Sequence, residues 1–158
     1  MIKILRAAAA GVILSTVFVA SVFAAGVDVN ATSTGLAMRG FDPVSYFKSG
    51  TPKAGTVDLT AVHNGATYRF ASKENKADFE ENPAKYAPAY GGYCAFGTAM
   101  GVKVDGDPKL WKIVDNKLYL NLSPAVQKRW EGDVNGFITK ADGTWENIKD
   151  KSPESLLN

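Results

Sequence analysis

The stretch that decides the fold is TVDLTAVHNGATYRF, residues 56–70. Its two arms, residues 56–63 and 66–70, are rich in the β-branched and aromatic residues that favour strands. Between them lies Asn64-Gly65, a pair that favours a two-residue turn because both residues tolerate a positive φ. The stretch therefore predicts an antiparallel β-hairpin.

Helix signals lie on both sides of this hairpin. Ser72 is a good N-cap and Glu74 falls in the first turn, so we expect a helix from residue 72 to about residue 81, before Pro83. Upstream, Asp42 caps a short helix whose first position is Pro43, where the missing N–H costs nothing.

A second hairpin is predicted further along, with arms at residues 111–114 and 117–120 around Asp115-Asn116. The spacing of apolar residues predicts a helix over residues 93–100, and Asp105 to Pro108 is expected to be a turn. Later helices are expected from Ser123-Pro124 to about Trp130, then in two short pieces at residues 137–140 and 143–149. The sequence displays no internal repeat. Together the elements predict a small single-domain α+β fold with two β-hairpins and several short helices.

The first 24 residues have the pattern of an export signal. Lys3 and Arg6 precede an apolar stretch, and Val22-Phe23-Ala24 suits cleavage after Ala24. An uncleaved membrane anchor is the alternative. The organisation we expect is a signal peptide at 1–24, a flexible lead-in at 25–36, the domain at 37–150 and a C-terminal tail at 151–158. This predicts a periplasmic protein with no stable membrane span after cleavage.

The charge balance excludes one class of partner. The chain has 18 Lys and Arg against 16 Asp and Glu, and cleavage removes Lys3 and Arg6, leaving 16 of each sign. A mature chain with no net charge and no cluster of cations predicts no binding to nucleic acid.

Cys94 is the only cysteine, so it cannot form a disulfide within the chain. If the helix begins near Gly92, Cys94 lies in its first turn, where free N–H groups and the helix dipole lower the pKa of a thiol. The alternative is a buried cysteine among Tyr90, Tyr93 and Phe96, acting as a small apolar side chain.

The stretch from Val57 to Tyr86 resembles the YHS domain family: a strand, an Asn-Gly turn, a strand that ends Tyr68-Arg69-Phe70, and a helix. The flanks Arg39 to Phe47, Gly91-Gly92-Tyr93-Cys94-Ala95 and Ile113 to Asn121 resemble the exported single-domain bacterial members.

The resemblance has two implications for chemistry. It implies metal binding through two cysteines after the second strand, but Ala71 and Asn75 hold those places, so that metal site does not carry over. Some exported members are described as selenoproteins with selenocysteine in the Gly-Gly-Tyr-Cys context. By resemblance, this points to redox or soft-metal chemistry at Cys94.

The candidate metal ligands are Cys94, Met100 and His63, with Met38 as a further thioether. If they converge, thiolate, imidazole and thioether together favour Cu(I). The alternatives are that His63, the only histidine, is a solvated turn residue and that Met100 is a core residue.

The large aromatic residues also allow two interpretations. They could line a ligand groove or form the core that a domain of this size needs; they are Trp111, Tyr119, Trp130 and Trp145.

Three functions stay open. The first is a periplasmic YHS-domain binding or sensing module that binds a soft metal such as copper through Cys94. The second is a thiol redox enzyme in which Cys94 is catalytic and an external periplasmic thiol resolves it. The third is a structural or interaction domain with an inert buried thiol. The sequence has no Gly-x-Ser-x-Gly, Cys-x-x-Cys or phosphate-binding loop, which favours a non-enzymatic protein.

Overall fold

The computed structural model describes residues 26–157, so the signal peptide expected at 1–24 lies outside the described residues. The described part has six α-helices and two two-stranded antiparallel sheets, which confirms the small single-domain α+β fold. In chain order the helices, strands and 3₁₀ turns are η1 (Met38–Gly40), α1 (Pro43–Ser49), β1 (Thr56–His63), β2 (Ala66–Phe70), α2 (Lys73–Glu81), α3 (Pro83–Tyr86), η2 (Ala89–Gly92), α4 (Ala95–Ala99), β3 (Asp107–Val114), β4 (Lys117–Asn121), α5 (Pro124–Glu131), α6 (Val134–Ile148) and η3 (Glu154–Leu156).

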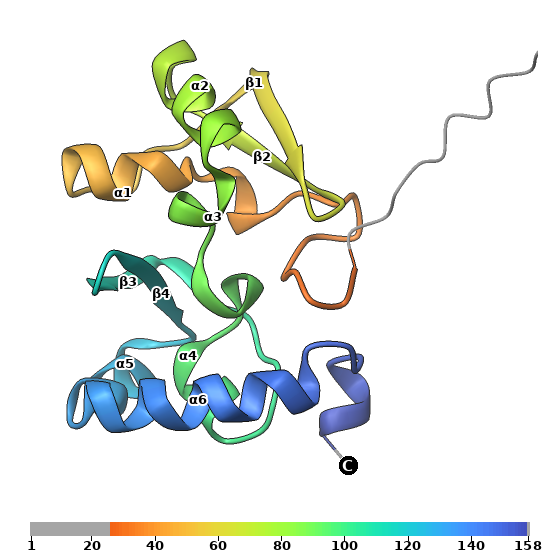
Figure 1. The fold of residues 1–158 in the computed structure, drawn as a ribbon, viewed down its shortest axis with the longest axis vertical. Helices are drawn as coiled ribbons and strands as arrows, with labels where there is room; N and C mark the ends of the chain where they lie inside the picture. The colour runs from red at the N-terminus through yellow and green to blue at the C-terminus, as the bar shows by residue number, and fades with distance from the viewer. Residues whose placement is uncertain (1–25, 158) are drawn as a thin grey trace, which may run out of the picture.

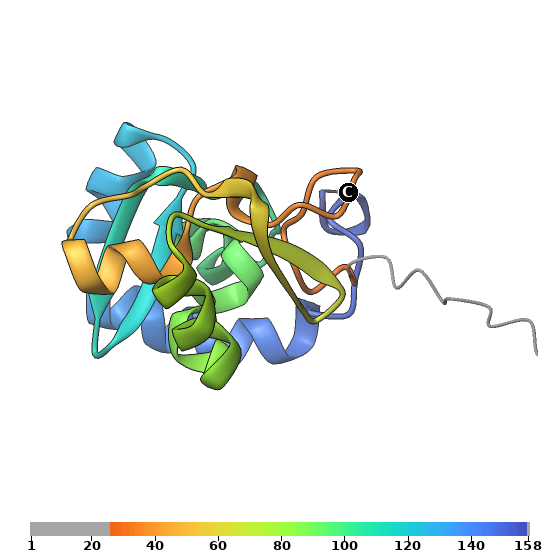
Figure 2. The same cartoon turned by 90° about the horizontal axis from the view of Figure 1, so that it is seen from above.

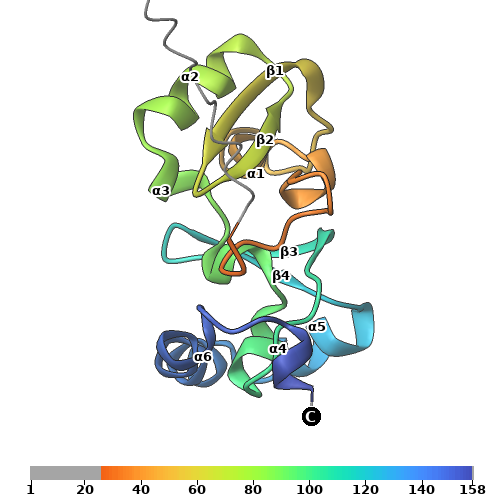
Figure 3. The same cartoon turned by 90° about the vertical axis from the view of Figure 1, so that its right-hand side faces the viewer.

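The elements form three levels (Figures 1 and 3). The β1–β2 hairpin with α1, α2 and α3 lies at one end, the β3–β4 hairpin lies in the middle, and α4, α5 and α6 lie at the other end. Seen from above, the three levels lie over one another (Figure 2). Within residues 26–157, no helix has the length and apolar character needed to cross a bilayer.

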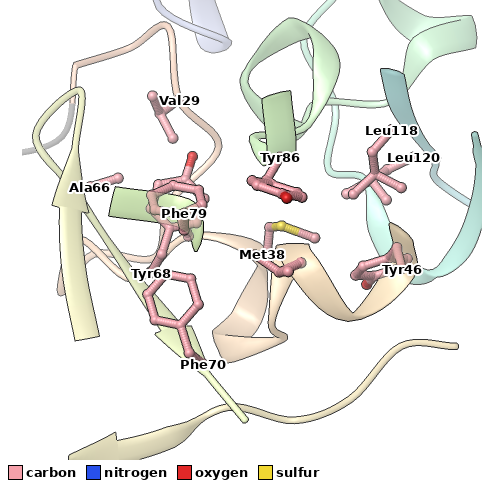
Figure 4. Packing of buried hydrophobic residues seen from close by; sticks show 12 residues of the cluster. Val29, Met38, Tyr46, Ala66, Tyr68, Phe70, Phe79, Tyr86, Leu118 and Leu120 are labelled. Atoms are coloured by element: carbon pink, nitrogen blue, oxygen red, sulfur yellow. The ribbon is translucent and has the colours of Figure 1, made fainter. Parts of the chain in front are cut away.

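Strand β4 joins two hydrophobic cores because its alternate side chains point to opposite faces. Leu118 and Leu120 enter the first core, which also holds Tyr68, Phe79 and other residues of the first hairpin and its helices (Figure 4). Tyr119 enters the second core with Trp130. Leu118, Tyr119 and Leu120 are each 2% exposed or less. Strand β4 of the middle hairpin is therefore covered on both faces.

The predictions that depend on turn residues and helix caps are confirmed for the first hairpin, for α2 and for α1. The first hairpin has the predicted arms, and Asn64 and Gly65 have φ of 49° and 72°. Ser72 accepts a hydrogen bond from the Asn75 N–H at 3.1 Å. The Asp42 side chain caps α1 with Pro43 at its first position.

Three predicted boundaries are wrong. The helix expected over residues 93–100 is limited to Ala95–Ala99, because residue 93 is extended and forms a bridge to Asp105. Strand β3 already begins at Asp107, inside the expected turn. The two short pieces expected after residue 134 are one continuous helix, α6, in which Gly143 is exposed and has open space around it. A glycine there costs about 1 kcal/mol, which the packing of α6 against α4 and α5 offsets.

The described chain contains a structural repeat that the sequence does not display. We name residues 38–81 the first unit and residues 90–131 the second unit. Each unit has an eight-residue strand, a two-residue turn, a five-residue strand, a serine cap and a helix. The irregularity of each ladder also falls at the same place, between Thr56 and Thr60 in one and between Asp107 and Trp111 in the other.

The backbone that precedes each hairpin repeats as well. Three consecutive residues with positive φ open each unit: Met38, Arg39 and Gly40 in the first, and Tyr90, Gly91 and Gly92 in the second. Two positions later, the Asp42 N–H donates to the Lys53 carbonyl at 2.8 Å and the Cys94 N–H donates to the Val104 carbonyl at 2.9 Å. Asp42 and Cys94 therefore hold equivalent positions.

The lead-in expected to be flexible is packed against the domain at Val29 and Asn30. Val29 is 5% exposed, and the Asn30 N–H donates to the Gly91 carbonyl at 2.9 Å. Lys103 is 1% exposed, and its ammonium donates to the carbonyls of Val27, Lys149 and Lys151. This buried cation ties the residues before the first unit to those after α6. This arrangement could not be predicted from the sequence, because it depends on three carbonyl groups that are distant from Lys103 along the chain.

Candidate functional site

Cys94 lies at the junction of α4 with the middle hairpin. The backbone of Cys94 forms a β-bridge with Leu120 of β4. Cys94 is also the N-cap residue of α4. The whole residue is 0% exposed. The thiol is therefore held between a helix terminus and a buried strand, and no path from solvent reaches it in this conformation.

The Cys94 sulfur has two polar neighbours. It accepts a hydrogen bond from the Gly97 N–H at 3.4 Å, as a cap does, and its S–H donates to Asn121 Oδ1 at 3.6 Å. The same oxygen accepts from the Phe96 N–H at 3.4 Å. Asn121 is 0% exposed, and its Nδ2 has no partner. The sequence could not identify Asn121, because only the fold brings the end of β4 beside α4.

Burial raises the pKa of the Cys94 thiol. The N–H groups of Gly97, Leu122 and Phe96 act in the opposite direction but do not outweigh the loss of hydration. The lowered pKa expected from the first turn of a helix is therefore wrong. Cys94 precedes the helix rather than lying in its first turn, and α4 has only five residues to supply a dipole.

The other candidate ligands lie in different surroundings. His63 ends β1 and contacts the ring of Phe79, with the ring centres 5.9 Å apart. Met100 is the C-cap of α4 and is 44% exposed. Met38 is 4% exposed and belongs to the first core. Within residues 26–157, the one side chain that hydrogen-bonds the Cys94 sulfur is that of Asn121.

Ala71 and Asn75, where the resemblance implied cysteines, both contact Asp42. The Ala71 N–H and the Asn75 Nδ2 both donate to Asp42 Oδ2, at 2.9 and 2.6 Å. Asp42 Oδ1 accepts from the Val44 N–H at 2.8 Å. This carboxylate is 0% exposed, so it fixes α1, β2 and α2 together. The described part of the chain has no group of three His, Cys, Asp or Glu residues arranged to hold a metal ion.

Comparisons of the chain with protein-family models, with curated proteins and with solved structures found no match. The assignment of a function therefore depends on the sequence and on the geometry described above.

Proposed function

We propose that this protein is an exported, non-enzymatic binding or interaction domain of the YHS type in which Cys94 is a structural thiol. The observation that carries the proposal is the position of the sulfur: it is fully buried and caps α4 through the Gly97 N–H. A nucleophilic or metal-binding cysteine needs a thiolate and access. Here burial raises the pKa of the thiol and covers the sulfur at the same time.

Two sequence features support the remaining parts of the proposal. The order of elements from Val57 to Tyr86, with its Asn-Gly turn and Ser72 cap, is the order that the resemblance to YHS domains implies. The pattern of residues 1–24 supports export to the periplasm. The absence of known catalytic motifs from the sequence favours a binding role over an enzymatic one.

A redox thiol is the second candidate, and one observation favours it. The N–H groups of Gly97, Leu122 and Phe96 face the sulfur and would stabilise a thiolate if an opening motion let a reactant approach. Copper binding at Cys94, with Met100 and His63, stays a prediction from the sequence. The candidates differ in what they require of Cys94, so one experiment separates them.

The experiment is titration of the native thiol with a chromogenic disulfide reagent at pH 7, with and without Cu(I). We expect no reaction of the folded protein over hours and one thiol per chain after denaturation in guanidinium chloride. We also expect Cu(I) to leave the melting temperature of the protein unchanged. Cys94→Ser is the matched control, since its hydroxyl can keep the cap and cannot react.

Either of two outcomes would overturn the proposal. Rapid labelling of the folded protein would establish an accessible, reactive thiol and favour the redox enzyme. A rise in melting temperature with Cu(I) that Cys94→Ser abolishes would establish a copper site, because a ligand that binds the folded state stabilises it.

A further inference from the structure

An open cavity of about 280 Å³ lies away from Cys94, where three parts of the chain meet. The segment between α3 and η2 forms one wall, the start of β4 a second and the middle of α6 a third. Small-molecule sites are concave and occur preferentially where separate elements meet. The cavity therefore has the placement of a ligand site.

Aromatic rings line this cavity. The ring of Tyr90 lies 5.8 Å from that of Tyr119 and 5.8 Å from that of Trp145, measured between centres. Tyr90 and Tyr119 are 7% and 2% exposed, so the second core holds their rings in place, while Trp145 is half-buried and more accessible. Rings held in this way offer a rigid surface on which a flat ligand packs without ordering side chains.

One hydrogen bond fixes the polar edge of the cavity. The Tyr90 hydroxyl donates to Asp142 Oδ1 at 2.8 Å. Burial and the Asp142 carboxylate both raise the pKa of Tyr90, so the hydroxyl keeps its proton. Asp142 is the one acidic residue among those that line the cavity, and one of its oxygens is already engaged.

Two cations also line the cavity, Lys85 and Lys117. Both are exposed, and within residues 26–157 no carboxylate lies close enough to form an ion pair with either. The Lys85 ammonium lies 4.9 Å from the centre of the Tyr86 ring. The cavity thus combines aromatic walls with two lysines that form no ion pair within residues 26–157, against one carboxylate, that of Asp142.

We propose that this cavity binds a small planar aromatic carboxylate, with its ring against Tyr90 and Trp145 and its carboxylate facing Lys85 and Lys117. A cavity of about 150 Å³ is enough for benzene, so this one accommodates a substituted ring. The proposal names a ligand class for the non-enzymatic binding role and rests on that role. It does not involve Cys94, so a failure of this proposal can be distinguished from a failure of the assignment of Cys94 as a structural thiol.

The test uses 4-hydroxybenzoate as the probe, and 4-hydroxybenzyl alcohol as its neutral counterpart. Binding is followed by amide chemical shifts in NMR spectra of the folded protein. We expect saturable shifts confined to residues around the cavity, and at least about fivefold weaker binding of the alcohol, the effect of losing one partly exposed charge pair. Lys117→Gln should weaken binding of 4-hydroxybenzoate about threefold to fivefold, and the double variant Lys85→Gln/Lys117→Gln should weaken it further.

Lys109→Gln is the matched control, because Lys109 is an exposed lysine of β3 that does not line the cavity. It should bind 4-hydroxybenzoate like the unaltered protein. All the lysines changed are on the surface, so the variants are expected to fold, and their melting temperatures check this. The proposal is overturned if no saturable shifts occur, if the neutral alcohol binds equally well, or if Lys109→Gln weakens binding as much as Lys117→Gln.

Discussion

The first and second units have the same backbone but place different chemistry at the same position. Asp42 in the first unit accepts four hydrogen bonds, from the N–H groups of Val44, Ser45 and Ala71 and from the Asn75 side chain. Cys94 in the second unit accepts one from Gly97 at 3.4 Å and donates one to Asn121. Both residues are fully buried helix caps.

The position is therefore set by the fold and not by reactivity. In the first unit several hydrogen-bond donors converge on this position, and a carboxylate occupies it. In the second unit fewer donors converge, and a thiol occupies it. This argues against interpreting a lone cysteine as a reactive group on the strength of its sequence context alone.

Phe79 of α2 and Trp130 of α5 hold equivalent positions and anchor these helices to the two cores. Their replacement should lower the stability of the protein more than any other change compared between the units. Phe79 packs on Tyr68 with ring centres 4.9 Å apart, and Trp130 packs on Tyr119 at 5.7 Å. Both anchors are 1% exposed or less. We expect Phe79→Ala and Trp130→Ala each to lower the free energy of unfolding by about 3–5 kcal/mol, measured by denaturant unfolding.

The control for this pair is Val57→Ala, at a residue that is 67% exposed. It should change the free energy of unfolding by less than about 0.5 kcal/mol. If one anchor proves dispensable while the other is essential, the two units are not energetically equivalent despite their common backbone.

Removal of the Asp42 cap should lower the stability of the protein more than removal of the Cys94 cap, because Asp42 accepts more hydrogen bonds. Asp42→Ala leaves several buried donors without an acceptor and should cost about 3 kcal/mol of stability. Cys94→Ala removes a small apolar contact and a weak cap and should cost about 1–2 kcal/mol. Denaturant unfolding at pH 7 measures both. A larger loss for Cys94→Ala than for Asp42→Ala would contradict the structural account of this position.

The positive-φ residues before each hairpin provide a third comparison. Arg39 has φ of 50° and Gly91 has φ of 62°, yet only the first carries a side chain. A Cβ at residue 91 would overlap the Asp28 carbonyl oxygen, so Gly91→Ala should cost about 1–3 kcal/mol. Arg39→Gly should change stability by less than about 1 kcal/mol. Thermal unfolding measures both, and equal losses would show that the Asp28 contact is unimportant.

The smallest effect concerns pH. Because burial raises the pKa of the Cys94 thiol above its ordinary value of 9.0, the unfolded chain releases this proton first. Above about pH 9 the thiol therefore lowers the free energy of unfolding as pH rises, by at most about 1.4 kcal/mol per pH unit. Below that pH its contribution is constant.

Comparison with Cys94→Ser between pH 8 and 10 isolates this contribution, since the buried tyrosines titrate in both proteins. The unaltered protein should lose stability faster than the variant over this interval. Parallel curves, or a relative gain for the unaltered protein, would mean that the folded thiol is not harder to ionise than the unfolded one.

Local chemistry explains which parts of the fold could be predicted. The first hairpin and the caps at Ser72 and Asp42 depend on residues within a few positions of one another, so the sequence indicates them directly. The start of α4 and the continuity of α6 depend on a bridge to Asp105 and on packing against distant helices. The structural repeat could not be predicted from the sequence, because its two units share backbone geometry but few side chains.

The α+β class, the two hairpins, the capped helices and the single cysteine can all be predicted from the residues themselves. The role of that cysteine depends on tertiary contacts. Its burial requires β4 and Asn121 to lie against α4, and its raised pKa follows from that loss of hydration. The aromatic cavity arises in the same way, since α6, β4 and the segment before η2 meet only in the folded chain. Burial and convergence depend on residues far apart in sequence, whereas turns and caps depend on near neighbours.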